Sequence, residues 1–362
     1  MKTTISRRAR TMPHAFHPPG RAGRRAAAVI LLLAPALLAS QPTRACATCG
    51  CTLSADAAAG YSALPGLRFN FEYDFINQDE LRTGRSTANP AQVVNAPSNP
   101  ALGGGEIEKQ TINRYLTMGV NYTPTPSWNF TMLVPYVMRS HTTFGQQSSP
   151  YTSSETAPDQ VSGARLSQLG DLKLIGSFQG LLPTHNLGLQ LGVKLPTGHY
   201  GTSVDFATGP NAGTPLDASL QAGTGSTDLI VGAYYYQAVS QNFDAFINTQ
   251  FQSAVAHKQD QPGNDFRPGN SASMSVGLRY EAHPSWVPQL QVNLLHKSAD
   301  QGALADTTDT AGTVAYLSPG VTLRVMDHLH VFGFAQLPVY SRLDGYQLFP
   351  RWTATVGGSY AF

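Results

Sequence analysis

The chain has 362 residues, with 24 Lys and Arg against 22 Asp and Glu, and a formal net charge of +2 at pH 7. The cations are unevenly spread, because residues 1–45 hold eight of them and no acidic residue. Without that segment 16 cationic residues face 22 acidic ones, a net charge of about −6, which removes the electrostatic basis for binding nucleic acid.

Residues 1–45 have the pattern of an export signal: a basic stretch, the apolar run AAAVILLLAPALLA from Ala26, and a small-residue exit. The apolar run is shorter than the roughly 20 residues that a transmembrane helix needs, and Pro35 interrupts it. We therefore predict a signal peptide over 1–45. Cleavage after Ala45 would leave Cys46 at the new N-terminus, whereas cleavage after Ala47 would remove it.

All three cysteines lie in the motif CATCGC, as Cys46, Cys49 and Cys51, within a short predicted periplasmic segment, 46–65. Gly50 follows Cys49 where c-type haem attachment requires His, so haem is disfavoured. Three interpretations stay open: a disulfide or redox-sensitive thiols, a soft-metal site for Cu(I) or Zn(II), or a lipid anchor on Cys46. The sequence predicts no other cofactor.

From residue 66 to residue 362 apolar and polar residues alternate with period two, which is typical of half-buried strands. In LRFNFEYDFIN, for example, the odd positions from Leu67 to Phe75 are apolar or aromatic and the even positions are polar. The pattern predicts twelve strands, at 67–77, 108–122, 128–142, 168–180, 187–197, 225–238, 243–257, 270–282, 287–297, 313–325, 329–341 and 351–362.

The predicted connections alternate between tight turns, such as TPTPS and VSQN, and long polar stretches, such as GHYGTSVDFATGPNAGTPLDASLQAGTG. This alternation, with both ends of the strand series on the short-turn side, favours an all-β fold: a transmembrane antiparallel barrel of about 12 strands over 66–362. A soluble β-sandwich is the competing interpretation, because its strands also alternate.

Aromatic residues bracket the predicted strands, as an interfacial girdle would, among them Trp128, Trp286 and Trp352. The chain ends in TVGGSYAF, and this ending resembles the C-terminal signature that the barrel-assembly machinery reads, with Phe362 last. We therefore expect the outer membrane of a Gram-negative bacterium, with a periplasmic N-terminus and membrane lipid as a partner.

Three phrases, GDLKLIGSF from Gly170, LGLQLGVKLPTGHYG from Leu187 and GTGSTDLIVGAYY from Gly223, follow in this order. Together they resemble the outer-membrane transporter family named for the meta-pathway of phenol degradation. The resemblance covers mainly the three predicted strands over 168–238, and it implies a porin-like or transport role linked to aromatic compounds. It assigns no substrate-binding residue, and CATCGC is not part of it.

If the apolar parity faces lipid, charged residues of both signs face the lumen, in a barrel wide enough to leave them room. They form either a polar pore lining or an interior salt-bridge network that fills the barrel. The candidates are Arg68, Glu72, Asp74, Arg139, Asp171, Lys173, Lys194, Asp228, Asp244, Arg279, Glu281, Arg324 and Arg351.

One arc of the predicted lumen is apolar. Its aromatic rings could guide hydrophobic or aromatic solutes, or could pack against an inward-folded loop or the N-terminal segment. The arc consists of Tyr234, Tyr236, Phe246, Phe332, Phe334 and Tyr340.

Histidines near predicted loop ends, at 141, 199, 257 and 296, suggest a metal ring, but only His141 has lumen parity. His328 and His330 could join the cysteine segment in a composite site. No HExxH, P-loop, Rossmann fingerprint or suggestive Ser–His pairing points to an enzyme.

The sequence therefore predicts an outer-membrane channel or transporter for small solutes, possibly aromatic or hydrophobic ones, without a chemical step. The alternative is a structural or metal-associated barrel whose CxxCxC segment binds copper, zinc or a redox partner.

Overall fold

The structure is a computed structural model, and it describes residues 65–90, 93, 106–145 and 160–362. The predicted signal peptide and the cysteine segment up to residue 64 lie outside the described residues. Antiparallel strands dominate the described part, and one short 3-10 helix, η3, lies among them in the chain order.

The elements are β1 Gly66–Gly84, β2 Ser86–Thr87, β3 Ile107–Thr125, β4 Trp128–Phe144, β5 Val161–Leu169, β6 Leu172–Phe178, β7 Leu187–Leu195, η3 Ala218–Leu220, β8 Ser226–Ala238, β9 Phe243–His257, β10 Asp260–Gln261, β11 Asn264–Asp265, β12 Ser271–Tyr280, β13 Trp286–Lys297, β14 Gly312–Met326 and β15 Leu329–Ala361.

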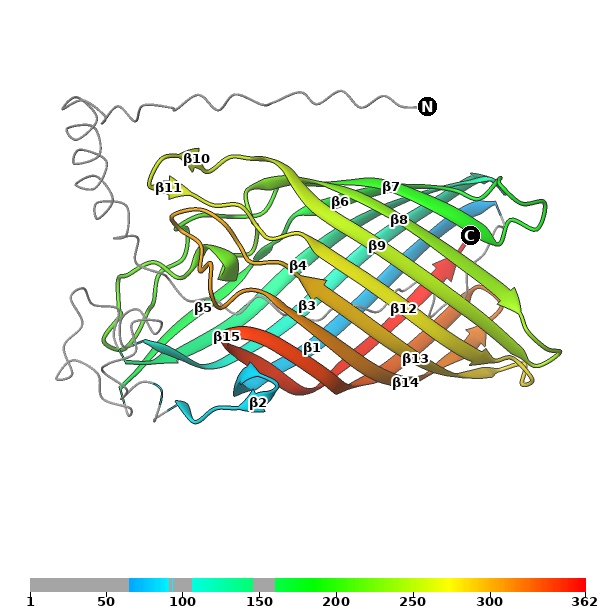
Figure 1. Cartoon of the computed structure of the whole chain (residues 1–362). Helices are drawn as coiled ribbons and strands as arrows, with labels where there is room; N and C mark the ends of the chain where they lie inside the picture. Colours follow the sequence, from blue (N-terminus) through cyan, green and yellow to red (C-terminus); the bar gives the residue numbers. More distant parts are fainter. Residues whose placement is uncertain (1–64, 91–92, 94–105, 146–159) are drawn as a thin grey trace, which may run out of the picture. The chain divides into compact units, whose positions relative to one another are not determined.

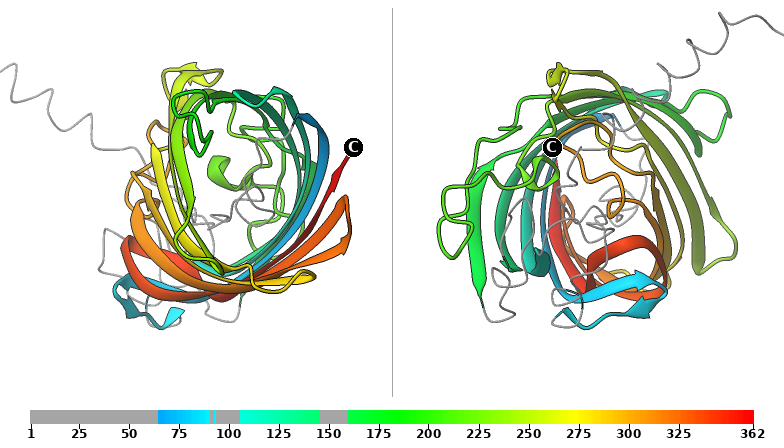
Figure 2. Two further views of the ribbon diagram at one scale, coloured as in Figure 1. Left: turned by 90° about the vertical axis from the view of Figure 1, so that its right-hand side faces the viewer. Right: turned by 60° about the vertical axis from the view of Figure 1, so that its left-hand side comes forward.

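The sheet closes on itself. Each long strand pairs antiparallel with its neighbours, and β15 returns to pair with β1, with Arg68 opposite Ala361. Figures 1 and 2 show the resulting barrel, with its last strand in red beside its first in blue. Closure pairs the backbone N–H and C=O groups that an open sheet edge would leave unsatisfied in lipid.

Two details bring the number of wall strands in the described residues to twelve. β15 forms two strands, because its first part pairs with β14 and its last part with β1, and Gly345 has a φ of 61° at the turn between them. β5 and β6 pair with successive parts of β4, so they form one strand broken at Gly170 and Asp171. The predicted barrel of about 12 strands is confirmed.

The prediction of a long loop between 341 and 351 is wrong. The two arms of β15 continue through it, and the chain reverses at Asp344 and Gly345. The glycine accepts a φ that other residues rarely adopt, so a short turn replaces the expected polar connection.

The two faces of the wall differ as the period-two pattern predicts. Outward-facing side chains are apolar and exposed, such as Phe71 (51% exposed), Leu191 (63%) and Val356 (53%). Lumen-facing positions carry buried polar side chains, such as Asn113, Gln291 and Thr355. Exposing this much hydrocarbon to water would be unfavourable, so the outer face of the barrel is suited to contact with lipid. No described helix combines the length and apolarity that a membrane span requires.

The long connection 196–225, which we call the inward loop, packs inside the barrel. Figure 2 shows its helical turn, η3, within the ring of strands. Phe206, Leu216 and Leu220 of the inward loop are almost completely buried and pack against Val137 of β4 and Leu166 of β5. A segment with a polar composition thus buries its few large apolar residues against the wall.

Candidate functional site

The three sequence phrases that resemble the transporter family converge at one point of the wall. Gly170, Gly198 and Gly223 lie so close together that a Cβ on Gly198 would stand 3.0 Å from the Cα atoms of the other two. The Thr197 hydroxyl donates to the Gly170 carbonyl (3.1 Å) and accepts from the Leu172 amide (2.9 Å). Glycine is required here because three backbones meet without room for side chains.

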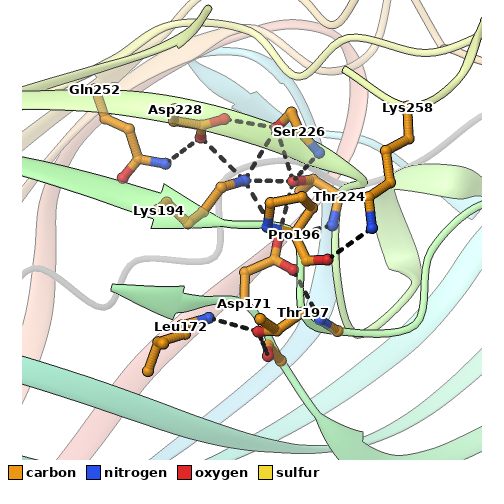
Figure 3. Close-up of polar contacts among 12 residues, drawn as sticks. Asp171, Leu172, Lys194, Pro196, Thr197, Thr224, Ser226, Asp228, Gln252 and Lys258 are labelled. Atoms are coloured by element: carbon orange, nitrogen blue, oxygen red, sulfur yellow. Dashed lines mark hydrogen bonds and ion pairs between the residues drawn. The ribbon is translucent and has the colours of Figure 1, made fainter. Parts of the chain in front are cut away.

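Beside these glycines lies a buried charged cluster, which we call the Lys194 network (Figure 3). The Lys194 Nζ lies 3.2 Å from Asp171 Oδ2 and 3.0 Å from Asp228 Oδ2, and it also donates to the hydroxyls of Thr224 and Ser226. Asp171 comes immediately before β6, Lys194 lies near the end of β7, and Asp228 lies near the start of β8. The network therefore joins both ends of the inward loop to the wall.

Further hydrogen bonds satisfy the two carboxylates. Asp171 accepts the backbone N–H groups of Gly198 (3.1 Å) and Thr224 (3.0 Å). Asp228 accepts the Ser226 hydroxyl and the Gln252 amide, each at 2.6 Å. Taking charges out of water is costly unless each is paired and hydrogen-bonded, and here one cation faces two anions whose other oxygens are occupied. This arrangement suits a structural clamp.

A second set of hydrogen bonds reaches the inward loop from the opposite direction. The Arg139 guanidinium donates to the Leu220 carbonyl of η3, to Asn113 Oδ1 (2.5 Å) and to the Tyr115 hydroxyl (2.9 Å). Asn113 in turn donates to Gln78 Oε1 (2.8 Å), and Gln78 donates to the Leu348 carbonyl (3.1 Å). This amide chain runs across β15, β1, β3 and β4 and ends on the inward loop.

The inward loop also pairs with the wall through its backbone. The amide of Gly163 in β5 donates to the Thr208 carbonyl (3.1 Å), and the Ala207 amide donates to the Gly163 carbonyl (2.8 Å). The other side of β5 pairs with β4. The inward loop thus occupies the edge of β5 where another wall strand would otherwise pair.

Most of the predicted lumen candidates lie on the inner face. Asp74 is buried and accepts the Thr355 hydroxyl (2.6 Å). Arg68 and Glu72 alternate with the exposed Phe69 and Phe71, and Lys173 stands opposite Lys194 in the β6–β7 pair.

A separate charged cluster lies near the tight-turn end. The Arg279 guanidinium is 2.9 Å from Glu281, and Arg324 forms an ion pair with the same carboxylate. Arg279 stands opposite Asp244 in the β12–β9 pair. The four residues balance two positive charges against two negative charges, so their local net charge is zero.

Arg351 does not line the lumen. In β15 the register shifts between Thr353, opposite Ile76, and Pro350, opposite Gln78. This bulge puts two successive side chains, Arg351 and Trp352, on the outer face. Arg351 has a 67% exposed side chain, and its guanidinium lies 3.5 Å from the Asp79 carboxylate.

A second bulge removes Tyr340 from the predicted aromatic arc. Ala315 stands opposite Tyr340, whereas the next residue, Tyr316, stands opposite Pro338. Beyond this shift Tyr340 faces outward, is 37% exposed, and receives a hydrogen bond from the Arg85 guanidinium (3.3 Å). Period-two phasing fails at both sites because it assumes an unbroken ladder.

The remaining aromatic rings lie inside. Tyr234, Phe246, Phe332 and Phe334 are only 3–5% exposed, and the Tyr236 hydroxyl donates to the His185 carbonyl (3.3 Å). The rings pack closely against the barrel wall in this conformation. Sequence analysis did not predict that glycines on neighbouring strands leave space for these rings. The period-two pattern does place those glycines on the lumen face.

Cys46, Cys49 and Cys51 lie outside the described residues. Among the described residues no group of three His, Cys, Asp or Glu side chains is arranged to hold a metal ion. His141 is buried, with its Nδ1 2.8 Å from the Thr111 hydroxyl. The ring of His328 lies 6.5 Å from that of Tyr360.

Sequence reasoning named Asp171, Lys194, Asp228 and Arg139 separately, but it did not bring them together. It missed Gln78 and Asn113 entirely. Both have lumen parity, and a search for buried amides beside Arg139 could have found them.

The fold is that of bacterial outer-membrane barrels. An outer-membrane channel from Pseudomonas putida F1 is similar over 83% of this chain and 96% of its own, at 11% identity and a TM-score of 0.57. The toluene transporter TbuX of Ralstonia pickettii is similar over 89% and 98%, at 11% identity and a TM-score of 0.44. No family model matches the chain, and no curated protein does. At such identities the similarity to the channel establishes the fold alone.

Proposed function

We propose that this protein is an outer-membrane channel or transporter for small solutes. The observation that carries the proposal is a closed barrel with an exposed apolar outer face and a polar, charged inner face. Such a barrel separates a watery interior from lipid, which is the physical requirement for passage across a membrane. The similarity in fold to the Pseudomonas putida channel supports it.

The proposed solutes are small aromatic or hydrophobic compounds. The resemblance of the three glycine-containing phrases to the phenol-degradation family supports this class, and that family assignment itself remains part of the proposal. The aromatic side chains of Tyr234, Phe246 and Phe334 lie on the inner face of the wall, where they are almost completely buried. Passage would depend on lumen shape and charge, and no chemical step is needed.

The orientation in the membrane is also proposed. The tight turns and the C-terminus lie at the same end of the barrel, where the Phe362 amide donates to the Leu67 carbonyl (2.9 Å). In barrels of this class short turns face the periplasm. The N-terminus would then be periplasmic, and the last strand, ending in Phe362, would be read by the barrel-assembly machinery.

The role of the cysteine segment is proposed as either a disulfide or a soft-metal site. Metal analysis of the mature protein, compared with Cys49→Ser and Cys51→Ser, distinguishes the two. Bound copper or zinc that is lost in both variants supports the metal site. A Cys–Cys disulfide in mass spectra without bound metal supports the disulfide.

Purified protein in planar bilayers tests the channel directly. A heat-modifiable band on a gel first verifies that the barrel is folded. We expect discrete conductance steps, and we expect vesicles that contain the protein to take up phenol-sized aromatic solutes faster than protein-free vesicles. Folded protein that gives neither current nor solute uptake refutes the proposal. Current without a preference for aromatic over polar solutes refutes only the solute class.

A further inference from the structure

Four inner aromatic rings share one arrangement: each lies over a glycine on the neighbouring strand. Phe246 stands opposite Gly277, Tyr234 opposite Gly188, and Phe334 opposite Gly320 in their strand pairs. The fourth ring, Phe332, lies over Gly357 between the two arms of β15. The same solution at four separate strand pairs indicates a shared physical requirement.

The fit leaves no room for a methyl group. A Cβ on Gly277 would stand 2.5 Å from both Cε1 and Cζ of Phe246, and one on Gly188 would stand 2.2 Å from Cζ of Tyr234. The corresponding distances are 2.1 Å from Gly320 to Cδ1 of Phe334 and 2.4 Å from Gly357 to Cζ of Phe332. Ordinary contacts of a Cβ begin near 3.4 Å, so each ring would have to move.

The direction of that movement follows from the strand neighbours. Phe246 has Gly277 on one side and the large side chain of Tyr236 on the other. A methyl group at Gly277 closes the first side, and Tyr236 already occupies the second. With both sideways directions blocked, the ring would have to tilt away from the wall, towards the lumen.

The four pairs lie outside the main apolar contact between the inward loop and the wall. They lie on strands from β7 to β15, whereas Phe206, Leu216 and Leu220 of the inward loop pack on β4 and β5. Ala218 of the inward loop packs instead with Phe266 and Ala305, which lie between wall strands.

We propose that Gly188, Gly277, Gly320 and Gly357 set the bore of the lumen by letting four aromatic rings lie flat against the wall. The inference rests on the proposed channel function and extends it to solute selection: the glycines determine which solute sizes pass. An aromatic side chain packed over a cross-strand glycine is a known way to stabilise a sheet, and here it also keeps bulky rings out of the path.

Gly277→Ala in the full chain tests the proposal. Because the tilted ring narrows the lumen, we expect single-channel conductance to fall by about twofold or more, and uptake of larger aromatic solutes to fall before that of smaller ones. The double variant Gly277→Ala/Phe246→Leu removes the ring and should recover the conductance of Phe246→Leu alone.

Gly333→Ala is the matched control, because a Cβ there meets nothing closer than 3.8 Å. It should leave conductance unchanged. Gly320→Ala repeats the test at a separate pair, so that poor assembly of one variant does not decide the outcome.

Folded Gly277→Ala and Gly320→Ala proteins that conduct like the wild type overturn the inference while leaving the channel intact. So does a loss in Gly277→Ala that Phe246→Leu fails to reverse. A folded wild-type barrel without conductance or uptake removes the proposed function and this inference with it.

Discussion

Neighbouring parts of the barrel are built to different heights. β1 and β3 have 19 residues each and β4 has 17, and we call them the tall wall. Next to β4 in the sheet, β6 has 7 residues after its break from β5 and β7 has 9, and we call these two the short wall. The tall wall is held along its length by backbone ladders. The short wall ends at Leu195. Beyond it the inward loop packs against the wall, and the Lys194 network holds both ends of that loop.

The difference shows which forces replace a missing strand. A strand satisfies its own backbone polar groups through its neighbours, but a folded loop needs side chains to do so. A buried cluster of three charges therefore lies where the wall is short, around Lys194, and the amide chain through Arg139 ties the tall wall to the same loop. The comparison predicts that charge removal is costly at the short wall and nearly neutral on the outside of the tall wall.

The largest effect is expected from Lys194→Met. It leaves the buried carboxylates of Asp171 and Asp228 without their cation, and breaking a buried ion pair typically costs about 3–5 kcal/mol. Urea unfolding followed by the heat-modifiable gel shift measures this loss. We also expect higher and noisier conductance, because both ends of the inward loop lose an anchor.

Lys109→Met on the tall wall is the control. Lys109 is exposed on β3, with its Nζ 5.1 Å from the centre of the Phe144 ring, and its replacement should cost less than about 1 kcal/mol. Equal losses for the two variants would show that the charged cluster has no special role at the short wall.

A smaller effect is expected from Arg139→Met, which removes the donors to Leu220, Asn113 and Tyr115. Because these acceptors would stay buried without their donor, the free energy of unfolding should fall by about 1–3 kcal/mol. Because the change loosens the inward loop more than the wall, proteolysis within 196–225 should accelerate while the barrel band persists on gels. Arg165→Met, an exposed cation on β5, provides the comparison. If Arg139→Met leaves the rate of cleavage unchanged, the amide chain does not hold the inward loop in place.

The smallest effect is expected from Arg351→Ala. Its ion pair with Asp79 is exposed, and such pairs contribute about 0–1 kcal/mol. Since its side chain faces outward, ion selectivity in bilayers should stay at the wild-type value. A shift in reversal potential under a salt gradient would place the guanidinium in the conduction path after all.

Period-two alternation predicted the strands because lipid and lumen impose opposite chemistry on alternate residues, and Leu187 to Leu195 became a strand as expected. It could not predict the bulges before Thr353 and near Tyr340, because one extra residue leaves composition unchanged and reverses the facing of its neighbours. It also divided β15 at a loop, although Gly345 allows a tight reversal.

The candidate site was predictable only in pieces. Asp171, Lys194 and Asp228 had the right parity, and the glycines beside them marked the phrases that carry the family resemblance. Their meeting required three chain segments separated by more than twenty residues to converge, and no local pattern encodes such a distance.

The sequence by itself determined the closed all-β barrel, its approximate strand number and the side of each regular strand that faces lipid, because these depend on local alternation and on the need to pair every backbone group in a membrane. Only the tertiary structure decided the height of each side of the wall, the inward course of 196–225 and the packing of rings over glycines. Those features depend on contacts between distant segments, where register, a bulge or a missing methyl group decides which side chains meet.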